Sequence, residues 1–382
     1  MSYLEYNTKR MPAGLAKVLY LDWGLVLLLI AVAGIGFLML YSVAGGSMTP
    51  WMEPQLKRFA LGMGLMFLVA FVPLWFWRSI SGLAFAVSVL LLVGVEFFGT
   101  IGMGARRWLE FGPVRLQPSE LAKITTIMAL AAYFDWIGTR KVSHPISVLI
   151  AALIVLIPTT LVLRQPDLGT AMLIALGGGV VIFAAGVHWA YFMTLIAAAG
   201  GLVAAVMASR GTEWQLLKDY QFRRIDAFLD PTIDPLGAGY HINQSMIALG
   251  SGGWSGRGFM EGTQARLNFL PEKHTDFIFT TLAEEFGFIG AASLLVLYLL
   301  ITGFCIVTAM RTTNRFGALL VLGVAGTFFL YFAVNMAMVM GLAPVVGVPL
   351  PLVSFGGSAM LVLMIGFGLV QSAHIHRARL PS

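Results

Sequence analysis

The chain has little charge and almost no cysteine. Only 11% of its 382 residues are charged, and its single cysteine, Cys305, lies in an apolar run, which excludes an intrachain disulfide. The sequence lacks the nucleotide-binding patterns G-x-x-x-x-G-K-[ST] and G-x-G-x-x-G after a strand, and no His/Cys cluster has zinc-site spacing. Any energy that the protein uses must therefore come from a substrate, a gradient or a partner.

Apolar residues are abundant instead. Hydrophobic residues make up 58% of the chain and the mean hydropathy is +0.86, whereas a soluble domain is roughly 45–50% apolar. Several apolar runs reach about 20 residues, the length that crosses a bilayer as a helix. The sequence therefore predicts an all-α, polytopic membrane protein that forms one domain over residues 1–382. In such a protein the net charge of +6 indicates basic residues that set the membrane topology or contact lipid headgroups, rather than residues that bind nucleic acid.

We expect ten membrane-spanning helices. The first follows a short leader, residues 1–21, and its apolar run is too long for a cleaved signal peptide. An even number of spans places both termini on one side, with a tail at residues 376–382. The expected spans are residues 22–43, 57–77, 79–99, 119–137, 146–164, 168–186, 190–208, 277–305, 316–340 and 357–375.

The basic residues favour cytoplasmic termini, because short cytoplasmic loops are enriched in Lys and Arg. With the termini inside, the inner segments carry ten basic residues: Lys9, Arg10, Lys17, Arg78, Arg140, Lys141, Arg311, Arg315, Arg377 and Arg379. The short outer loops carry six: Lys57, Arg58, Arg106, Arg107, Arg115 and Arg164. This orientation implies a cytoplasmic (inner) membrane protein whose longest loop faces outward.

That longest loop, residues 209–276, follows the seventh span. It holds too many aromatic residues to be a disordered tail. We expect an amphipathic interfacial helix within LLKDYQFRRIDAFLD and a short helix within GYHINQSMIALGSGG. A second outer segment, residues 341–356, is interrupted by prolines and glycines, so it must be buried in protein or line a wet cavity.

The end of the long loop carries a dense cluster of polar residues. Within five positions stand two carboxylates, a lysine, a histidine and a threonine, namely Glu272, Lys273, His274, Thr275 and Asp276. The sequence then stays apolar for about thirty residues, as expected of a long span. Polar groups at the mouth of a membrane helix are costly and indicate function.

Further polar side chains accompany the expected helix starts. Glu120 and Lys123 share one helix face, either as a capping acid with an ion pair or as the wall of a substrate cavity. Asp167 suits a helix N-cap. Arg58, Arg106 and Arg107 suit headgroup contacts singly, and together they favour an anionic ligand. No firm role follows for Glu96, Glu284 or Glu285, although the last two would suit a metal or a nearby base.

Seven segments in order resemble the SEDS family (shape, elongation, division, sporulation), over nearly the whole chain. The segment GVPLPLVSFGG resembles the rod-elongation branch rather than the division branch. The segments are GARRW (104–108), QPSELAK (117–123), QPDLGT (165–170), YQFRRIDAFLDP (220–231), GYHINQSMIALGSGG (239–253), GTQARLNFLPEKHTDFIF (262–279) and GLAPVVGVPLPLVSFGGS (341–358).

The resemblance implies a ten-helix glycosyltransferase that polymerises lipid II outside the cytoplasmic membrane, with a class B penicillin-binding protein as the transpeptidase partner. It places the essential carboxylate on Asp276. Substrate-binding roles fall on the other matched polar positions and their neighbours: Arg58, Arg107, Trp108, Glu120, Lys123, Asp167, Gln244, His274, Thr275 and Ser354.

The chemistry of glycan extension agrees with this assignment. A sugar hydroxyl attacks the anomeric carbon of a second sugar, and a lipid pyrophosphate leaves, so no nucleotide cofactor is required. Asp276 would act as the general base, or would bind a divalent cation such as Mg²⁺ or Mn²⁺ together with the pyrophosphate. Arg58, Arg107 and Lys123 would offset the charge of the leaving group.

Two other classes of function remain open. A flippase or transporter of lipid-linked sugars would also need polar residues within the membrane. However, the charged motifs cluster towards one face, and no inverted repeat is evident. A scaffold that only activates the penicillin-binding partner would not need Asp276 for polymer formation.

Overall fold

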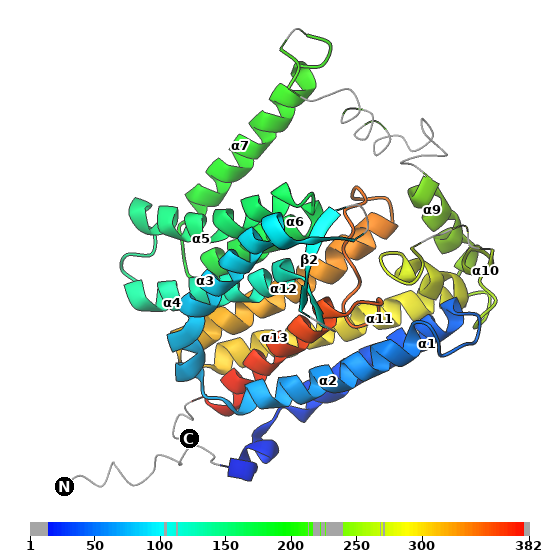
Figure 1. Cartoon of the computed structure of the whole chain (residues 1–382), viewed down its shortest axis with the longest axis horizontal. Coiled ribbons are helices and arrows are strands. Elements are labelled where there is room, and N and C mark those ends of the chain that lie inside the picture. Colours follow the sequence, from blue (N-terminus) through cyan, green and yellow to red (C-terminus); the bar gives the residue numbers. More distant parts are fainter. Residues whose placement is uncertain are drawn as a thin grey trace.

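The computed structural model describes residues 14–102, 105–111, 114–212, 214–216, 222, 226, 240–267, 269 and 272–377. The fold is predominantly helical, and most of its helices lie side by side in one bundle (Figure 1). The helical elements are η2 (Gly14–Tyr20), α1 (Trp23–Val43), α2 (Met52–Phe71), α3 (Leu74–Phe98), α4 (Pro118–Ile137), α5 (Pro145–Arg164), α6 (Leu168–Ala184), α7 (Trp189–Ala208), α9 (Tyr240–Gly252), α10 (Thr263–Arg266), α11 (Ile278–Arg311), α12 (Arg315–Val339) and α13 (Ser358–Ile375).

Seven of these helices are long and apolar enough to cross a bilayer: α1, α3, α5, α7, α11, α12 and α13. The chain is therefore a multi-pass membrane protein, as predicted. Each of the ten expected spans overlaps a helix. The helices α2, α4 and α6 are not among the seven, and α6 is only 17 residues long. The count of ten spans and the layout of the loops stay predictions.

A small antiparallel sheet, which the sequence did not predict, accompanies the predominantly helical fold. Strands β1 (Thr100–Gly102), β2 (Ala105–Phe111) and β3 (Val114–Leu116) form this sheet in the order β1-β2-β3. They connect α3 to α4, within a segment that the sequence analysis treated as a simple outer loop. The sheet pairs backbone groups that would otherwise lack partners at the end of the bundle.

Aromatic packing fills the centre of the bundle. Tyr298 of α11 stacks on Phe332 of α12, with ring centroids 4.9 Å apart, and Phe328 contacts both Tyr298 and Phe367 of α13 edge-on. Helix α13 packs closely along α2. In contrast, α7 has no buried residue and projects away from the other helices (Figure 1). Its apolar surface suits lipid.

Contacts at the two ends of α1 define the two ends of the helical body. The start of α1 meets the end of α13, where Gln371 exchanges two hydrogen bonds with the backbone of Asp22, at 2.9 and 3.0 Å. At the other end of α1, the Ser42 hydroxyl bonds to Glu285 near the start of α11. Since α1 enters and α13 leaves at the same end, an even number of passes separates them.

Helix α11 contains a break at Gly287, whose φ of +64° is left-handed. The loop that follows α9 enters this break. The amides of Arg257 and Gly258 donate to the carbonyls of Glu284 and Glu285, at 3.0 and 3.1 Å. In return, the amides of Phe288 and Ile289 donate to the carbonyls of Gly253 and Trp254, at 2.9 and 3.1 Å. We call residues 253–258 the strap. It supplies partners for backbone groups that the break would leave unpaired.

The buried carboxylate of Glu284 stabilises the same region. It accepts hydrogen bonds from the amides of Thr263 and Gln264, at 2.8 and 3.1 Å, at the start of α10. A carboxylate at a helix N-terminus accepts hydrogen bonds from amides that lack partners within the helix, and its negative charge interacts favourably with the positive end of the helix dipole. Glu284 therefore fixes α10 on α11.

The predicted helix within GYHINQSMIALGSGG is confirmed as α9. The predicted amphipathic helix within LLKDYQFRRIDAFLD lies almost wholly outside the described residues, as do residues 1–13 of the leader and 378–382 of the tail.

Candidate functional site

The irregular segment after α12, residues 341–357, forms the floor of the candidate site. As expected from its prolines and glycines, it is not helical, and its residues from Val348 to Ser354 are mostly buried. Tyr298 donates a hydrogen bond to the carbonyl of Pro351, at 2.7 Å. Gly36 of α1 lies so close that an added Cβ would be 2.7 Å from the carbonyl oxygen of Leu352. Close approach to α1 therefore requires glycine at position 36.

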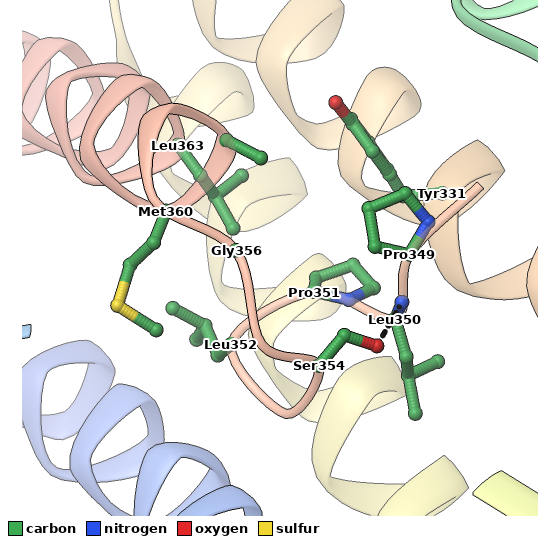
Figure 2. A pocket seen from close by; sticks show the side chains of 10 residues that line it. Tyr331, Pro349, Leu350, Pro351, Leu352, Ser354, Gly356, Met360 and Leu363 are labelled. Carbon is green, nitrogen blue, oxygen red and sulfur yellow. Dashed lines mark hydrogen bonds between the residues drawn. The ribbon is translucent and has the colours of Figure 1, made fainter. Parts of the chain in front are cut away.

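Ser354 joins this segment to the turn that carries Asp276. Its hydroxyl accepts from the amide of Leu350, at 2.7 Å, and donates to the carbonyl of Thr275, at 2.6 Å. Figure 2 shows the Ser354–Leu350 contact beside a narrow pocket. The volume of that pocket, about 20 Å³, holds little more than one water. Ser354, predicted to bind substrate, thus positions backbone in this structure.

Gln55 of α2 holds the same segment from the opposite side. This fully buried side chain donates to the carbonyl of Ser354, at 2.9 Å, and accepts from the amide of Gly356, at 3.3 Å. Three residues later on α2, Arg58 lies over the ring of Phe355 at 4.7 Å. Within the described part of the chain, one terminal nitrogen of Arg58 is buried without a hydrogen-bond partner. Arg58 thus has a free donor beside the segment.

Asp276 lies at the last turn before α11. Asn335 of α12 donates to its backbone carbonyl, at 2.8 Å, and also to the carbonyl of Val348, at 2.7 Å. Gly347 lies beside the carboxylate, and a Cβ added to it would be 3.6 Å from Oδ2, an ordinary contact distance. Burial and, to a smaller extent, the negative charges of Glu272 and Asp167 together raise the pKa of Asp276 to about 6. A carboxyl with this pKa is mostly deprotonated at neutral pH and can still accept a proton effectively.

The predicted neighbours of Asp276 have other contacts. The hydroxyl of Thr275 donates to the carboxylate of Glu272, at 2.8 Å, rather than to Asp276. The His274 ring stacks on Trp51, with centroids 4.6 Å apart, and lies 6.1 Å from Phe355. Burial lowers the pKa of His274, so the ring is neutral at pH 7. His274 therefore packs the turn against α2.

Asp167 comes from the start of α6. Its carboxylate accepts from the amide of Thr170, at 3.1 Å, which makes it the expected N-cap. It also accepts from Gln117, at 3.4 Å, and lies 3.9 Å from a terminal nitrogen of Arg107. Arg107 donates to the carbonyls of Gln165 and Pro166. The structure therefore brings Arg107 to Asp167, within electrostatic range of Asp276.

Glu120 and Lys123 form a buried ion pair between α4 and α12. Lys123 lies 2.7 Å from Glu120 and also bonds to the hydroxyl of Tyr331, which donates to the second oxygen of Glu120, at 3.1 Å. Tyr331 lines both a small cavity at this pair and the pocket of Figure 2. Lys123 is thus paired in this structure, as the ion-pair alternative expects.

Two predicted residues lie outside these contacts. Trp108 stands on β2, opposite Thr100, and is half-buried. Gln244 stands on α9, next to Ser245, whose hydroxyl donates to the carbonyl of Val339, at 2.8 Å. The contacts of the described residues connect neither side chain to Asp276. Their substrate-binding roles stay predictions.

The site offers few protein ligands for a metal. Among the described residues, no group of three or more His, Cys, Asp or Glu side chains could hold an ion. Asp276, Glu272 and Asp167 interact electrostatically without forming such a cluster. Mg²⁺ often takes one or two carboxylates and completes its shell with phosphate oxygens and water. The residues therefore fit a cation only together with a phosphate-bearing substrate.

Sequence reasoning missed Gln55, Trp51, Tyr331 and Asn335. Two of them, Tyr331 and Asn335, lie one turn apart on α12, in an otherwise apolar run. A buried amide within a membrane helix is costly without partners, and this signal points to Asn335. Nothing in the sequence shows which backbone groups it reaches.

The chain belongs to the FtsW/RodA/SpoVE family of cell cycle proteins, whose sequence pattern matches residues 22–379. Curated relatives extend over nearly all of the chain. Peptidoglycan glycosyltransferase MrdB of Escherichia coli (strain K12) is 44% identical over 363 residues, covering 94% of this chain and 95% of the relative. Peptidoglycan glycosyltransferase RodA of Treponema pallidum (strain Nichols) is 31% identical, covering 92% and 96%. The predicted family is thereby confirmed.

Solved structures share the fold. A chain from a peptidoglycan synthase complex that coordinates polymerization and crosslinking is 33% identical, with a TM-score of 0.80, and the match covers 93% of this chain and 97% of that one. The rod shape determining protein RodA of Thermus thermophilus is 29% identical, with a TM-score of 0.70, covering 94% and 98%.

Proposed function

We propose that this chain polymerises lipid II into glycan strands, with Asp276 as the general base. Asp276 takes the proton from the attacking sugar hydroxyl, the new glycosidic bond forms at the anomeric carbon of the second sugar, and undecaprenyl pyrophosphate leaves. The observation that carries the proposal is the half-buried Asp276, with a pKa of about 6, held by Asn335 and beside Gly347. The predicted class of enzyme, a peptidoglycan glycosyltransferase, is confirmed by the relatives that bear this name.

Arg58 is the favoured partner for the leaving pyrophosphate. Its free, buried nitrogen lies beside the segment that bonds to the Asp276 turn. Arg107 and Lys123 already pair with Asp167 and Glu120, so their positive charges are partly offset in this arrangement. Arg is well suited to phosphate oxygens because its donors form a rigid fork.

A divalent cation, Mg²⁺ or Mn²⁺, would bind between Asp276 and the pyrophosphate and would neutralise charge there. In that arrangement the protein binds the cation well only when substrate is present. Chelation should then leave the unfolding temperature of the substrate-free protein unchanged.

The proposal extends to the orientation in the membrane. The Asp276 turn lies near the end of α1 that meets Glu285, opposite the end where Asp22 meets Gln371. With cytoplasmic termini, which the basic residues favour, Asp276 faces the extracytoplasmic side of the inner membrane. A class B penicillin-binding protein is the proposed partner, supported by the similar chain within a peptidoglycan synthase complex.

The deciding experiment measures glycan polymerisation from purified lipid II, with the partner present, for wild type and Asp276→Ala. We expect loss of at least about 100-fold in rate, since general bases typically contribute this much. Normal glycan from the variant within an intact complex would refute the catalytic role. A lipid-scrambling assay on the same samples tests the alternative of a flippase or transporter, for which translocation without polymerisation is expected.

A further inference from the structure

A second polar cavity is lined by Trp51 and takes no part in the proposed reaction. It has a volume of about 420 Å³, within the usual range for small-molecule sites. Its walls come from the end of α1, the residues just before α2, α10, the turn before Asp276 and the first part of α11. The polar side chains that line it are Ser42, Arg266, Lys273 and Glu285.

Two basic side chains line the cavity. Lys273 lines it with a side chain that is about nine-tenths buried, and Arg266 lines it from the exposed end of α10. Lys273 precedes His274, whose ring stacks on Trp51. An anionic group that binds Lys273 would therefore contact the same turn that carries the candidate base, Asp276.

Negative groups line the same cavity. Glu285 is buried, and its carboxylate accepts from the hydroxyl of Ser42. The C-terminal end of α1, from Ser42 to Gly45, also lines the cavity, and the dipole of a helix places partial negative charge at this end. These groups favour an ammonium or hydroxyl donor and oppose a second anion.

Apolar groups complete the lining, namely Val43, Pro50 and Trp51. A pyrophosphate would bring several negative charges towards Glu285, so it fits this arrangement poorly. A group with a carboxylate, an amine and an aliphatic body matches the basic, negative and apolar residues that line the cavity.

We infer that this cavity, called here the Lys273 cavity, binds the zwitterionic peptide portion of the peptidoglycan precursor. The inference rests on the proposed function. Lys273 and Arg266 bind the peptide carboxylate, while Glu285 and the end of α1 receive the amine. Binding here anchors the sugar to which the peptide is attached next to the Asp276 turn.

A binding experiment tests the cavity without requiring catalysis. The probe is the soluble disaccharide-peptide, without lipid or pyrophosphate, and its effect on the unfolding temperature of the full chain is compared with that of the same disaccharide lacking peptide. We expect the peptide-bearing probe alone to stabilise wild type. Lys273→Gln and Arg266→Gln should abolish the shift. The exposed Lys57, paired with Glu53 outside the cavity, provides the matched control Lys57→Gln, which should keep it.

Kinetics then separate the peptide from the pyrophosphate. For lipid II, we expect Lys273→Gln to raise KM about tenfold with kcat within about twofold of wild type. For the lipid-linked disaccharide without peptide, the KM values of variant and wild type should agree. An equal rise with both substrates would assign Lys273 to the pyrophosphate and overturn the inference.

The two proposals fail separately. If wild type polymerises lipid II while Lys273→Gln and Arg266→Gln leave both KM and probe binding unchanged, the cavity assignment is wrong and the proposed function stands. If wild type makes no glycan, the proposed function fails, and the binding experiment still decides whether the cavity takes the peptide. Arg266 is exposed, so its variant remains informative if Lys273→Gln does not fold.

Discussion

Asn335 donates one amide hydrogen to the backbone carbonyl of Asp276 and the other to Val348, at 2.8 and 2.7 Å. A single buried side chain of α12 therefore fixes the Asp276 turn relative to the irregular segment 341–357. Gln55 and Ser354 fix the same segment to α2 and to Thr275. The position of the candidate base is set by backbone contacts, which leave its carboxylate available to a substrate.

The rate of polymerisation should depend on pH through Asp276. A general base must be deprotonated, so kcat/KM should rise with pH through about 6, the pKa of Asp276. Glu272→Gln removes one of the two negative charges that raise this pKa, and the rising limb should move to lower pH. The profile is measured from about pH 4.5 to about pH 8. The exposed Glu53 supplies the control Glu53→Gln, which should leave the limb in place; a limb unmoved by Glu272→Gln would contradict the electrostatic argument.

Asp276→Asn should stabilise the protein at neutral and alkaline pH. The folded-state pKa of about 6 exceeds the ordinary 3.8, so the protonated form is favoured in the folded protein. The protonated carboxyl contributes about 3 kcal/mol to the free energy of unfolding. This contribution is fully present below about pH 4 and is lost as the pH rises through about 6. Thermal unfolding in detergent should show the variant above wild type at pH 8 and close to it at pH 4. A difference that is the same at both pH values would exclude titration of Asp276 as the cause.

Gly287→Ala should strongly destabilise α11. The left-handed backbone alone costs about 1–2 kcal/mol for a residue with a side chain, and the added Cβ would lie 2.3 Å from the amide nitrogen of Gly256 in the strap. Gly303 is the matched control, because it lies in the same helix with no atom within 4 Å of an added Cβ. Gly303→Ala should be neutral or stabilising by about 0.5–1 kcal/mol. Equal unfolding temperatures for the two variants would contradict the described break.

Lys123→Met should cost about 3–5 kcal/mol, because it leaves the buried charge of Glu120 without its partner. The double variant Glu120→Gln/Lys123→Met removes both charges and should recover much of the loss. Unfolding temperatures of the single and double variants measure this coupling. Additive losses would show that the pair is not coupled, and the KM of the recovered variant for lipid II tests the predicted substrate contact.

Much of the fold follows from hydrophobic runs, because membrane helices bury their own backbone groups and need little long-range information. A helix overlaps each of the ten expected ranges. The sheet was missed because β1 and β3 have only three residues each, too short for a period-two pattern. The break in α11 was missed because the strap that pairs with it lies some thirty residues earlier in the chain.

The candidate site was only partly predictable. The density of polar residues in an apolar chain pointed to the Asp276 turn, and Asp167 is the N-cap that its sequence suggested. The sequence does not predict the contacts of Gln55 and Asn335, because both side chains bind backbone carbonyls of an irregular segment that is distant in the chain. Such partners carry no sequence signature. The predicted catalytic and substrate-binding roles therefore depend on the experiments above.

The break at Gly287 also has a consequence for cooperativity. In an unbroken helix each turn can fray on its own, whereas here four hydrogen bonds cross between α11 and residues 253–258. The part of α11 around the break and the loop after α9 must therefore open together. Protection from hydrogen exchange at Arg257, Gly258, Phe288 and Ile289 would be lost in one event, with a single opening free energy for two segments far apart in sequence.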